Sequence, residues 1–314
     1  MQALYFDKKV QYKTDYPMPK PTKNEVLVKV LLAAVCTTDV QITRGYKGFK
    51  GVLGHEFVGV VKHSEDSSLI GKRVVADINI GCSNCDFCKR DLNNHCKNRK
   101  VLGILGKDGA FADYITVPKS NLFVVPDSVS DNQAVFTEIL ASAIQITEQV
   151  HLDSSHQVAI VGDGKLASLI TQVVKTCKCK IVVIGKHKEN LNFFKEFAET
   201  LWVDNLKNER VFDVVIDCTG NSQGLQTALK IVKPRGKVVL KSTYFDRATI
   251  DLSQIVVNEI KIVGSRCGPM DRALDFLKKK VVKTEALVGG YYHLKDWEEA
   301  FAQRHRLKSV FRIN

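Results

Sequence analysis

Residues 157–265 alternate short apolar runs with segments of helical character, and this alternation constrains the fold more than any other feature of the sequence. Successive parallel strands need a crossover connection, which a helix usually provides. We therefore predict an α/β architecture in which helices cover both faces of a doubly wound parallel sheet. The predicted strands are Val158–Val161, Ile181–Ile184, Val211–Asp217, Lys237–Leu240 and Ile260–Gly264, and the predicted helices include Lys165–Lys175, Lys188–Ala198 and Ser222–Val232.

The first 130 residues show a different pattern, in which β-branched or apolar runs such as Val26–Val30 and Phe57–Val61 are separated by glycine and proline turns. This pattern predicts a separate, mostly-β domain. A last helix near Met270–Lys280 precedes a short terminal segment, Ser309–Ile313, which we expect to return to the first domain. We predict that residues 1–150 and 289–314 form one domain and that residues 151–288 form the other.

A glycine-rich turn, Gly162-Asp163-Gly164-Lys165-Leu166-Ala167, follows the first of the predicted parallel strands and opens a helix. In this context the glycines permit a tight turn whose exposed amides face a pyrophosphate at the helix N-terminus. Alanine is an accepted variant of the third glycine. The sequence therefore predicts a dinucleotide site that includes Gly162, Gly164, Lys165 and Leu166.

The end of the next predicted strand indicates which dinucleotide is bound. An NAD-binding strand usually ends in Asp or Glu, whose carboxylate binds the ribose hydroxyls. Here the strand ends in Gly185-Lys186-His187-Lys188, so we expect glycine to leave room for a 2′-phosphate and Lys186 and Lys188 to neutralise it. This predicts that NADP(H) is preferred over NAD(H). The alternative is an exposed basic turn that binds no ligand.

Cys82, Cys85, Cys88 and Cys96, here named the four-cysteine loop, have the spacing C-x2-C-x2-C-x7-C. Four soft ligands on one short loop are typical of a closed tetrahedral site, so we expect a structural zinc ion. An iron–sulfur cluster is an alternative, but the ferredoxin run continues with three residues and Cys-Pro, whereas seven residues and then Lys97 follow here. A DNA-binding finger is a weaker alternative, because no recognition helix follows the thiols.

A second set of metal-ligand residues is dispersed along the chain and comprises Cys36, His55, Glu56 and, far downstream, Glu138. A thiol, an imidazole and a carboxylate match an open, catalytic zinc site. Each residue alone has a plainer interpretation, since a lone cysteine is often a small core residue and a Gly-His-Glu triplet arises by chance. Glu138 lies among apolar residues of a predicted helix, where a carboxylate without a partner is costly. The sequence alone does not place Glu138 near Cys36.

Composition and charge narrow the classes of partner. The chain has 46 Lys and Arg against 34 Asp and Glu, a formal net charge of +12, but the basic residues are spread along it, so we expect no nucleic-acid partner. It has no run of 18 apolar residues and no signal peptide, so we expect no membrane partner and a cytoplasmic location. In a reducing compartment the nine cysteines favour metal binding over disulfides.

Six motifs extend over nearly the whole chain: Cys36–Asp39, Gly54–Glu56 with Gly59, the four-cysteine loop, Gly109–Tyr114, Glu138–Ala141 and Asp213–Gly220. In combination they resemble the zinc-dependent medium-chain alcohol dehydrogenase superfamily, in particular its threonine, sorbitol and glucose dehydrogenase branch. The resemblance implies a GroES-like, mostly-β catalytic domain and a Rossmann domain. It also implies two zinc ions per subunit and a homodimer or homotetramer.

The resemblance assigns roles to the dispersed ligand residues. It implies that Cys36, His55 and Glu138 hold the catalytic zinc, with Glu56 as a nearby or exchanging ligand. It further implies that the cofactor is contacted by Thr219, Lys241 and Ser242.

Two neighbours of Cys36 receive roles from the same resemblance. Thr38 matches the hydroxyl that passes on the substrate proton, and Asp39 matches the acceptor that orients His55. The chain also departs from the family at two positions. Gln41 replaces a histidine that relays the proton to solvent, so water or the cofactor ribose completes the path, and Ile139 replaces the usual proline after the glutamate.

We therefore expect an oxidoreductase that transfers a hydride between an alcohol, of polyol or sugar type, and NADP(H), with zinc as the Lewis acid. A non-catalytic NADP(H)-binding redox sensor or scaffold is the alternative from another class. A zinc-free quinone or enoyl reductase is the alternative within enzymes. Two zinc ions per subunit favour the dehydrogenase, whereas one or none favours the other functions.

Overall fold

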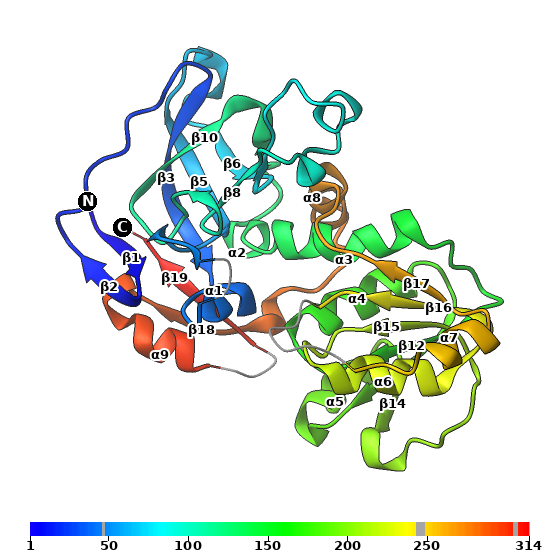
Figure 1. Ribbon diagram of the computed structural model, residues 1–314. Coiled ribbons are helices and arrows are strands. Elements are labelled where there is room, and N and C mark those ends of the chain that lie inside the picture. Colours follow the sequence, from blue (N-terminus) through cyan, green and yellow to red (C-terminus); the bar gives the residue numbers. More distant parts are fainter. Residues whose placement is uncertain (46–47, 243–248, 304–306, 314) are drawn as a thin grey trace. The chain divides into compact units, whose positions relative to one another are not determined.

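The computed structural model describes residues 1–45, 48–242, 249–303 and 307–313. Its chain divides into two compact units, coloured by sequence in Figure 1. Unit 1 comprises Met1–Glu138 and Met270–Asn314, and unit 2 comprises Ile139–Pro269. The boundaries suggested by the sequence lie at residues 150 and 289. Helix α8 (Met270–Lys278) contacts α2 (Asp131–Ala134), which is why this part of the chain groups with unit 1.

Unit 1 is built on a mixed β-sheet. Its strands are β3 (Glu25–Ala34), β5 (Glu56–His63), β6 (Arg73–Ala76), β10 (Tyr114–Pro118), β11 (Leu122–Val124), β18 (Val288–Tyr292) and β19 (Lys308–Arg312). The strands follow the order β11-β6-β5-β3-β19-β18, and β10 also pairs with β3. The long central strand β3 alternates buried and half-buried side chains, because Val26, Val28 and Val30 face the core.

The C-terminal strand β19 pairs antiparallel with β3, with Val310 opposite Ala34. The predicted return of the terminal segment to the first domain is therefore confirmed. This pairing places Lys308, the first residue of β19, near the end of β3. The remaining elements of unit 1 are β1 (Ala3–Asp7), β2 (Lys9–Lys13), β4 (Gly51–Val52), β7 (Asn79–Ile80), β8 (Lys100–Leu102), β9 (Gly106–Lys107), α1 (Thr37–Ile42) and α9 (Trp297–Ala302).

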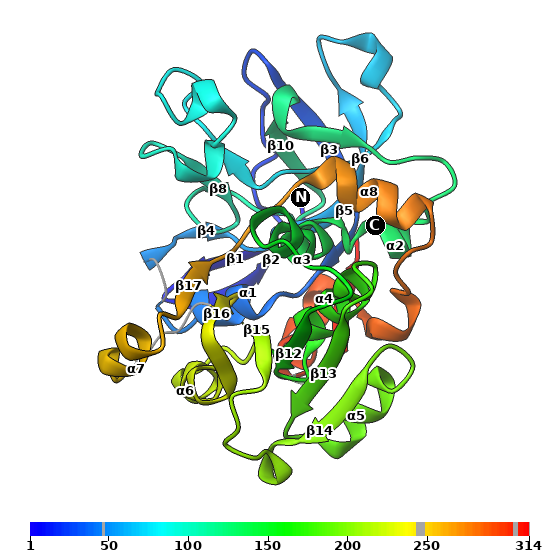
Figure 2. The ribbon, with the colours of Figure 1, turned by 90° about the vertical axis from the view of Figure 1, so that its right-hand side faces the viewer.

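Unit 2 contains the predicted parallel sheet. Its strands are β12 (Gln157–Val161), β13 (Lys180–Gly185), β14 (Glu199–Trp202), β15 (Phe212–Asp217), β16 (Val232–Leu240) and β17 (Lys261–Gly264). They run parallel in the order β14-β13-β12-β15-β16-β17, which Figure 2 shows side by side. Counted from β12, this is the 3-2-1-4-5-6 order of a doubly wound dinucleotide-binding sheet. The predicted fold of this region is confirmed.

The helices of unit 2 follow the strands as predicted, with two differences. They are α4 (Lys165–Lys175), α5 (Lys188–Phe194), α6 (Ser222–Ile231) and α7 (Leu252–Val257), and α3 (Thr137–Gln149) enters the unit from unit 1. Helix α5 ends four residues before Ala198, because the chain must turn into β14. Neither β14 nor α7 was predicted. Within the described part of the chain, no helix combines the length and apolar character that crossing a membrane requires.

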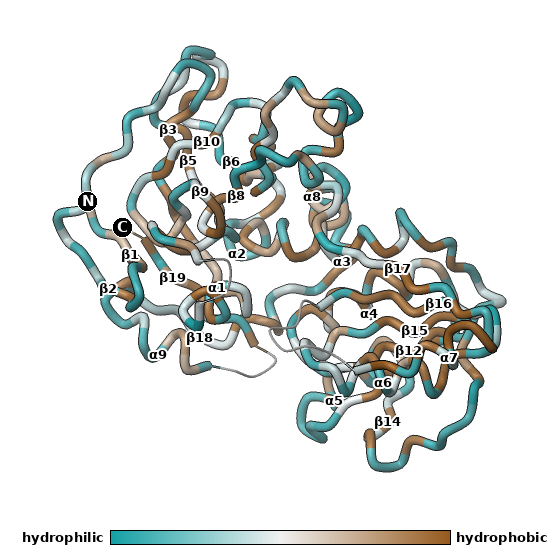
Figure 3. The backbone as a smooth tube through the Cα atoms, in the orientation of Figure 1, coloured by the Kyte–Doolittle hydropathy of each residue, from teal (hydrophilic) through white to brown (hydrophobic). Residues whose placement is uncertain are grey.

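The core of unit 2 lies on both faces of its sheet. Val158, Ala159 and Ile160 are consecutive residues of β12, and all three are fully buried. Successive side chains of a strand point to opposite faces, so both faces of β12 must be covered. Figure 3 shows the central strands of this sheet as predominantly hydrophobic. The carboxyl ends of these apolar strands are therefore followed by polar residues, which are candidates for a ligand site.

Candidate functional site

The end of β3 and the start of β5 bring a thiol, an imidazole and a carboxylate together. Cys36 follows β3 and precedes α1, whereas Glu56 opens β5, which pairs with the end of β3. The ligand atoms of Cys36, His55 and Glu56 lie within 4.8 Å of one another. Gly54 permits this close packing, because its φ is +95° and a side chain there would meet the Phe111 ring at 2.4 Å.

Asp39 contacts both the backbone of Cys36 and the ring of His55. Its buried carboxylate accepts a hydrogen bond from the Cys36 backbone N–H at Oδ2 (2.8 Å), and its Oδ1 lies 3.1 Å from His55 Nδ1. An ionised carboxylate only accepts, so Nδ1 carries the proton and Nε2 is left for a metal. Burial lowers the pKa of His55, but the charges of Asp39 and Cys36 outweigh it and raise that pKa above its ordinary value. The contact that the resemblance implies between Asp39 and His55 is present.

Glu56 also has a partner that the sequence did not predict. The Lys308 ammonium donates to Glu56 Oε2, and both side chains are fully buried. Burial lowers the pKa of Lys308, but the charges of Glu56 and Cys36 raise it more. Oε1, the other carboxylate oxygen of Glu56, is buried and has no hydrogen-bond partner among the described residues. A lysine at the start of an apolar strand gave no signal of this role.

Glu138 and Thr38 lie around this group. Glu138, at the start of α3, is not among the side chains whose ligand atoms lie within 4.8 Å of one another. Burial raises its pKa to about 7, and the charges of His55 and Glu56 act on it in opposite directions. Thr38 Oγ1 lies 3.7 Å from Cys36 Sγ. The structure therefore brings Glu56, rather than Glu138, into the closest group with Cys36 and His55.

The three grouped side chains fit a zinc ion in their chemistry. Thiolate, imidazole and carboxylate are its usual protein ligands. A buried carboxylate oxygen without a partner is rare in proteins, because burial removes its hydration without replacement. Glu56 Oε1 is such an atom, and a cation at this position would satisfy it.

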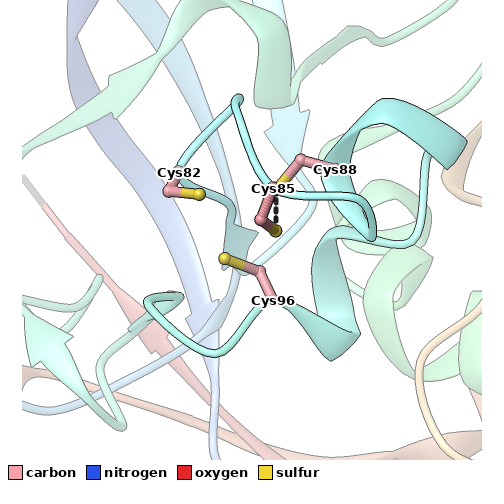
Figure 4. A group of neighbouring side chains, drawn as sticks. All are labelled: Cys82, Cys85, Cys88 and Cys96. Carbon is pink, nitrogen blue, oxygen red and sulfur yellow. Dashed lines mark hydrogen bonds between the residues drawn. The ribbon is translucent and has the colours of Figure 1, made fainter.

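The four-cysteine loop lies between β7 and β8, and Figure 4 shows its four sulfurs turned toward a common centre. All four Sγ atoms lie within 4.8 Å of one another, and those of Cys85 and Cys88 are 3.6 Å apart. Tetrahedral zinc with bonds of about 2.3 Å separates its sulfurs by about 3.8 Å. Hydrogen bonds from the Asn84 and Cys85 backbone lower the pKa of Cys82 to about 6, which favours a thiolate ligand.

In unit 2, the glycine turn has the backbone that the sequence predicts. Gly162 adopts a φ of +122°, and a side chain there would approach the Cys218 backbone to 3.1 Å. Gly164 precedes α4, and a Cβ on it would meet nothing within 4 Å. Lys165 and Leu166, which open the helix, are half-buried. The first turn of α4 is therefore reachable by a ligand over Gly164.

The end of β13 differs from the expectation in one respect. Gly185 does not leave an open space, because the Asp163 carboxylate from the glycine turn fills it. Lys186 is exposed, whereas the ammonium of Lys188 lies 4.1 Å from the centre of the Trp202 ring. The contact between Asp163 and Gly185 could not be predicted, because it joins two strands that are separated by a helix.

The other predicted cofactor residues follow β15 and β16. Thr219 donates to Asp217 Oδ1 through both its backbone N–H (2.9 Å) and its hydroxyl (2.8 Å). Lys241 is buried, and its ammonium donates to Ser265 Oγ at 3.1 Å and to the Arg266 carbonyl at 2.5 Å. Ser242, the next residue, is half-buried. All of them lie at the carboxyl ends of the strands, where doubly wound sheets bind ligands.

Comparisons with known proteins agree with these features. Residues 22–127 match the family model of the alcohol dehydrogenase GroES-like domain, and residues 166–279 match that of zinc-binding dehydrogenases. D-arabitol-phosphate dehydrogenase of Enterococcus avium is 26% identical over 91% of this chain and 88% of its own. For sorbitol dehydrogenase of Bacillus subtilis these values are 27%, 93% and 90%. The structure of short chain alcohol dehydrogenase RspB from Escherichia coli CFT073 with NADH has a TM-score of 0.90, 25% identity and 99% coverage of both chains.

Proposed function

The chain belongs to the zinc-dependent medium-chain alcohol dehydrogenase superfamily, and we propose that it transfers a hydride between a polyol- or sugar-type alcohol and NADP(H). One observation carries this proposal: Cys36 and His55 lie beside a buried Glu56 whose Oε1 has no partner in the described residues. Burying a carboxylate oxygen without a partner costs free energy, and a redox sensor, a scaffold or a zinc-free reductase does not need this group of side chains. The metal-dependent enzyme is therefore favoured.

Two zinc ions per subunit follow from the two ligand sets. Cys36 and His55 would hold the catalytic ion, with Glu56 and Glu138 as the carboxylates that complete the site. The four-cysteine loop would hold the structural ion. When bound, the catalytic ion supplies Lewis-acid polarisation of the substrate oxygen and the dinucleotide supplies or accepts the hydride.

The chain's own residues position the reacting groups and move the proton. Asp39 holds the Cys36 backbone and the His55 ring in one arrangement. Thr38 Oγ1, which lies 3.7 Å from Cys36 Sγ, accepts the proton that the alcohol loses. Gln41 cannot change its protonation state, so water or the cofactor ribose takes the proton from Thr38. Lys308 fixes one oxygen of Glu56 and leaves the other free.

We infer the preference for NADP(H) from residues of this chain and not from RspB, because RspB was solved with NADH. The glycine turn and the start of α4 would receive the pyrophosphate. Beside them, β13 ends without an acidic residue, and the exposed Lys186 follows it. A positive charge at this point attracts the 2′-phosphate that only NADP(H) carries.

The substrate class is inferred from the names of the relatives. D-arabitol-phosphate dehydrogenase and sorbitol dehydrogenase both act on open-chain polyols by name. We therefore expect a polyol or a polyol phosphate here, and neither nucleic acid nor a membrane as a partner. None of the nine cysteines forms a disulfide, and we therefore propose a reducing compartment such as the cytoplasm.

We also infer a homodimer or homotetramer. Helix α7 exposes Leu252, Val256 and Val257, here named the α7 apolar patch, by 65%, 75% and 79%. Adjacent exposed apolar side chains on a soluble domain are typical of a protein interface. The neighbouring strand β17 ends the sheet order, so a second copy could cover both features.

The test is a panel of sugar alcohols, polyol phosphates, amino alcohols and simple alcohols, each assayed with NADP⁺ and NAD⁺. We expect a polyol or polyol phosphate to be oxidised most efficiently with NADP⁺. Cys36→Ser should abolish turnover and lose one zinc ion per subunit, but it should leave NADPH binding unchanged. Cys177→Ser, which changes a half-buried thiol of unit 2, is the matched control. Full activity of C36S would contradict the metal-dependent mechanism.

A further inference from the structure

The carboxyl end of β13 is where a doubly wound sheet normally supplies the side chain that contacts the adenosine ribose. Gly185 has no side chain, and the Asp163 carboxylate occupies the space in which one would lie. A Cβ on residue 185 would lie 2.6 Å from Asp163 Oδ2 and 2.7 Å from Asp163 Cβ. No side chain fits there without displacing Asp163. The glycine is therefore required by this carboxylate, and a 2′-phosphate cannot occupy the same space.

His187 covers the Asp163 carboxylate. Its backbone N–H donates to Oδ2 (2.7 Å), and its Nδ1 lies 2.9 Å from Oδ1. Asp163 is only 6% exposed, so its carboxylate is buried where His187 contacts it. Since an ionised carboxylate only accepts, Nδ1 carries a proton and the imidazole is held in one orientation.

The opposite edge of the same ring is available to a ligand. The His187 side chain is 47% exposed, and none of the described residues makes a hydrogen bond to its Nε2. The neighbouring cations are less well placed, because Lys188 lies over Trp202 and Lys186 is a free surface lysine. His187 is thus the group at this strand end whose position is fixed by a buried partner.

We propose that His187, oriented by Asp163, binds the 2′-phosphate of NADP(H) and so determines the choice between the two dinucleotides. The inference rests on the proposed function, since it needs a dinucleotide over the glycine turn. With Nδ1 held by Asp163, the outer edge of the ring presents Nε2, from which an N–H can donate a charge-assisted hydrogen bond to the phosphate. Lys186 adds charge from solvent, and the 2′-phosphate lies over His187 rather than in the space beside Gly185.

Calorimetric titration of the full-length protein with two probes tests this inference. Adenosine 2′,5′-bisphosphate carries the 2′-phosphate, whereas adenosine 5′-monophosphate lacks it. We expect the unchanged protein to bind the bisphosphate more tightly. His187→Ala should lower the bisphosphate affinity by about tenfold or more and leave the monophosphate affinity unchanged.

Two further variants separate recognition from structure. His187→Asn keeps a side-chain donor for Asp163 but lacks Nε2, so it should behave as H187A does. His151→Ala is the matched control, because His151 is also an exposed histidine of unit 2 that contacts an aspartate, Asp153 at 3.1 Å. We expect H151A to bind both probes normally.

The outcomes distinguish this inference from the proposed function. If the preference for the bisphosphate survives both His187 substitutions, the role of His187 is overturned but the NADP(H) preference stands. Equal loss of both probes also overturns it, because His187 would then only support the fold. If the unchanged protein binds both probes equally, the NADP(H) preference fails together with this role, while zinc content and alcohol oxidation still report on the dehydrogenase itself.

Discussion

Lys308 and Glu56 form an ion pair that is fully buried, although 252 residues separate them in the sequence. The two residues open β19 and β5, which lie on either side of β3. Neither charge would be tolerated there alone, because burial removes its hydration. The pair holds one oxygen of Glu56 and leaves the other for the group that contains Cys36 and His55.

We expect Lys308→Met to lower the free energy of unfolding by about 3–5 kcal/mol, because it leaves the Glu56 charge buried without a partner. The double variant E56Q/K308M removes both charges and should lose clearly less. Urea denaturation of the metal-free proteins, followed by circular dichroism, measures both values. Equal losses in the single and double variants would mean that the ion pair contributes only its packing.

Asp39→Asn should weaken binding of the catalytic ion by about 10–100-fold. The amide retains a single acceptor oxygen, so it cannot accept from both the Cys36 backbone and the His55 ring. Competition with a chelator, followed by zinc analysis, should show that one ion leaves D39N early and the other stays. Asp153→Asn, an exposed change in unit 2, is the control. Retention of both ions by D39N would refute the orienting role.

Replacement of Cys96 tests the four-cysteine loop. Cys96 is its only fully buried thiol, so we expect Cys96→Ser to lose one zinc ion per subunit and to make residues 82–96 sensitive to proteases. Binding of adenosine phosphates by unit 2 should not change. Zinc analysis and limited proteolysis with mass spectrometry provide the readouts. A C96S protein with two zinc ions and normal protease resistance would exclude the structural ion from this loop.

The parts of unit 2 that local patterns describe could be predicted from the sequence. Helix α4 begins and ends at the predicted residues, because the glycine turn and the apolar periodicity are both local signals. Strand β14 was missed, since Glu199–Trp202 is short and mostly half-exposed and has no clear alternation. Helix α7 was missed because three of its four apolar side chains, Leu252, Val256 and Val257, face solvent, where a buried helical face was sought.

The ligand types of the candidate sites could be predicted from the sequence, but some of their long-range contacts could not. Cys36, His55 and Glu56 could be selected because thiol, imidazole and carboxylate are characteristic metal ligands. Lys308 could not, because its burial arises from the pairing of β19 with β3, which no local pattern encodes. His187 was passed over for a similar reason, since its partner Asp163 lies 24 residues away.

Glu25 and Lys107 provide a pH-dependent contribution to stability in unit 1. Burial raises the pKa of Glu25, but hydrogen bonds from Lys107 (2.5 Å) and Thr22 outweigh it and hold that pKa below its usual value. A lowered folded-state pKa stabilises the protein above the unfolded value of about 4.3, and this stabilisation is lost as pH falls through the folded-state pKa. Glu25→Gln should therefore be less stable than the unchanged protein at pH 7, and in thermal unfolding this difference should disappear as pH falls through the lowered folded-state pKa of Glu25. A constant difference at all pH values would contradict the assignment.

The α7 apolar patch makes the proposed self-association testable. Val256 and Val257 are the most exposed large apolar residues in the described part of the chain, and they lie near the strand that ends the unit 2 sheet. If a second copy covers them, two carboxylates there must be desolvated and will repel their symmetry mates, since a two-fold interface meets itself. The double substitution V256E/V257E should therefore yield monomers in size-exclusion chromatography with light scattering. Val124→Glu, at an exposed valine of unit 1, should keep the oligomer. An unchanged mass for V256E/V257E would place the interface elsewhere.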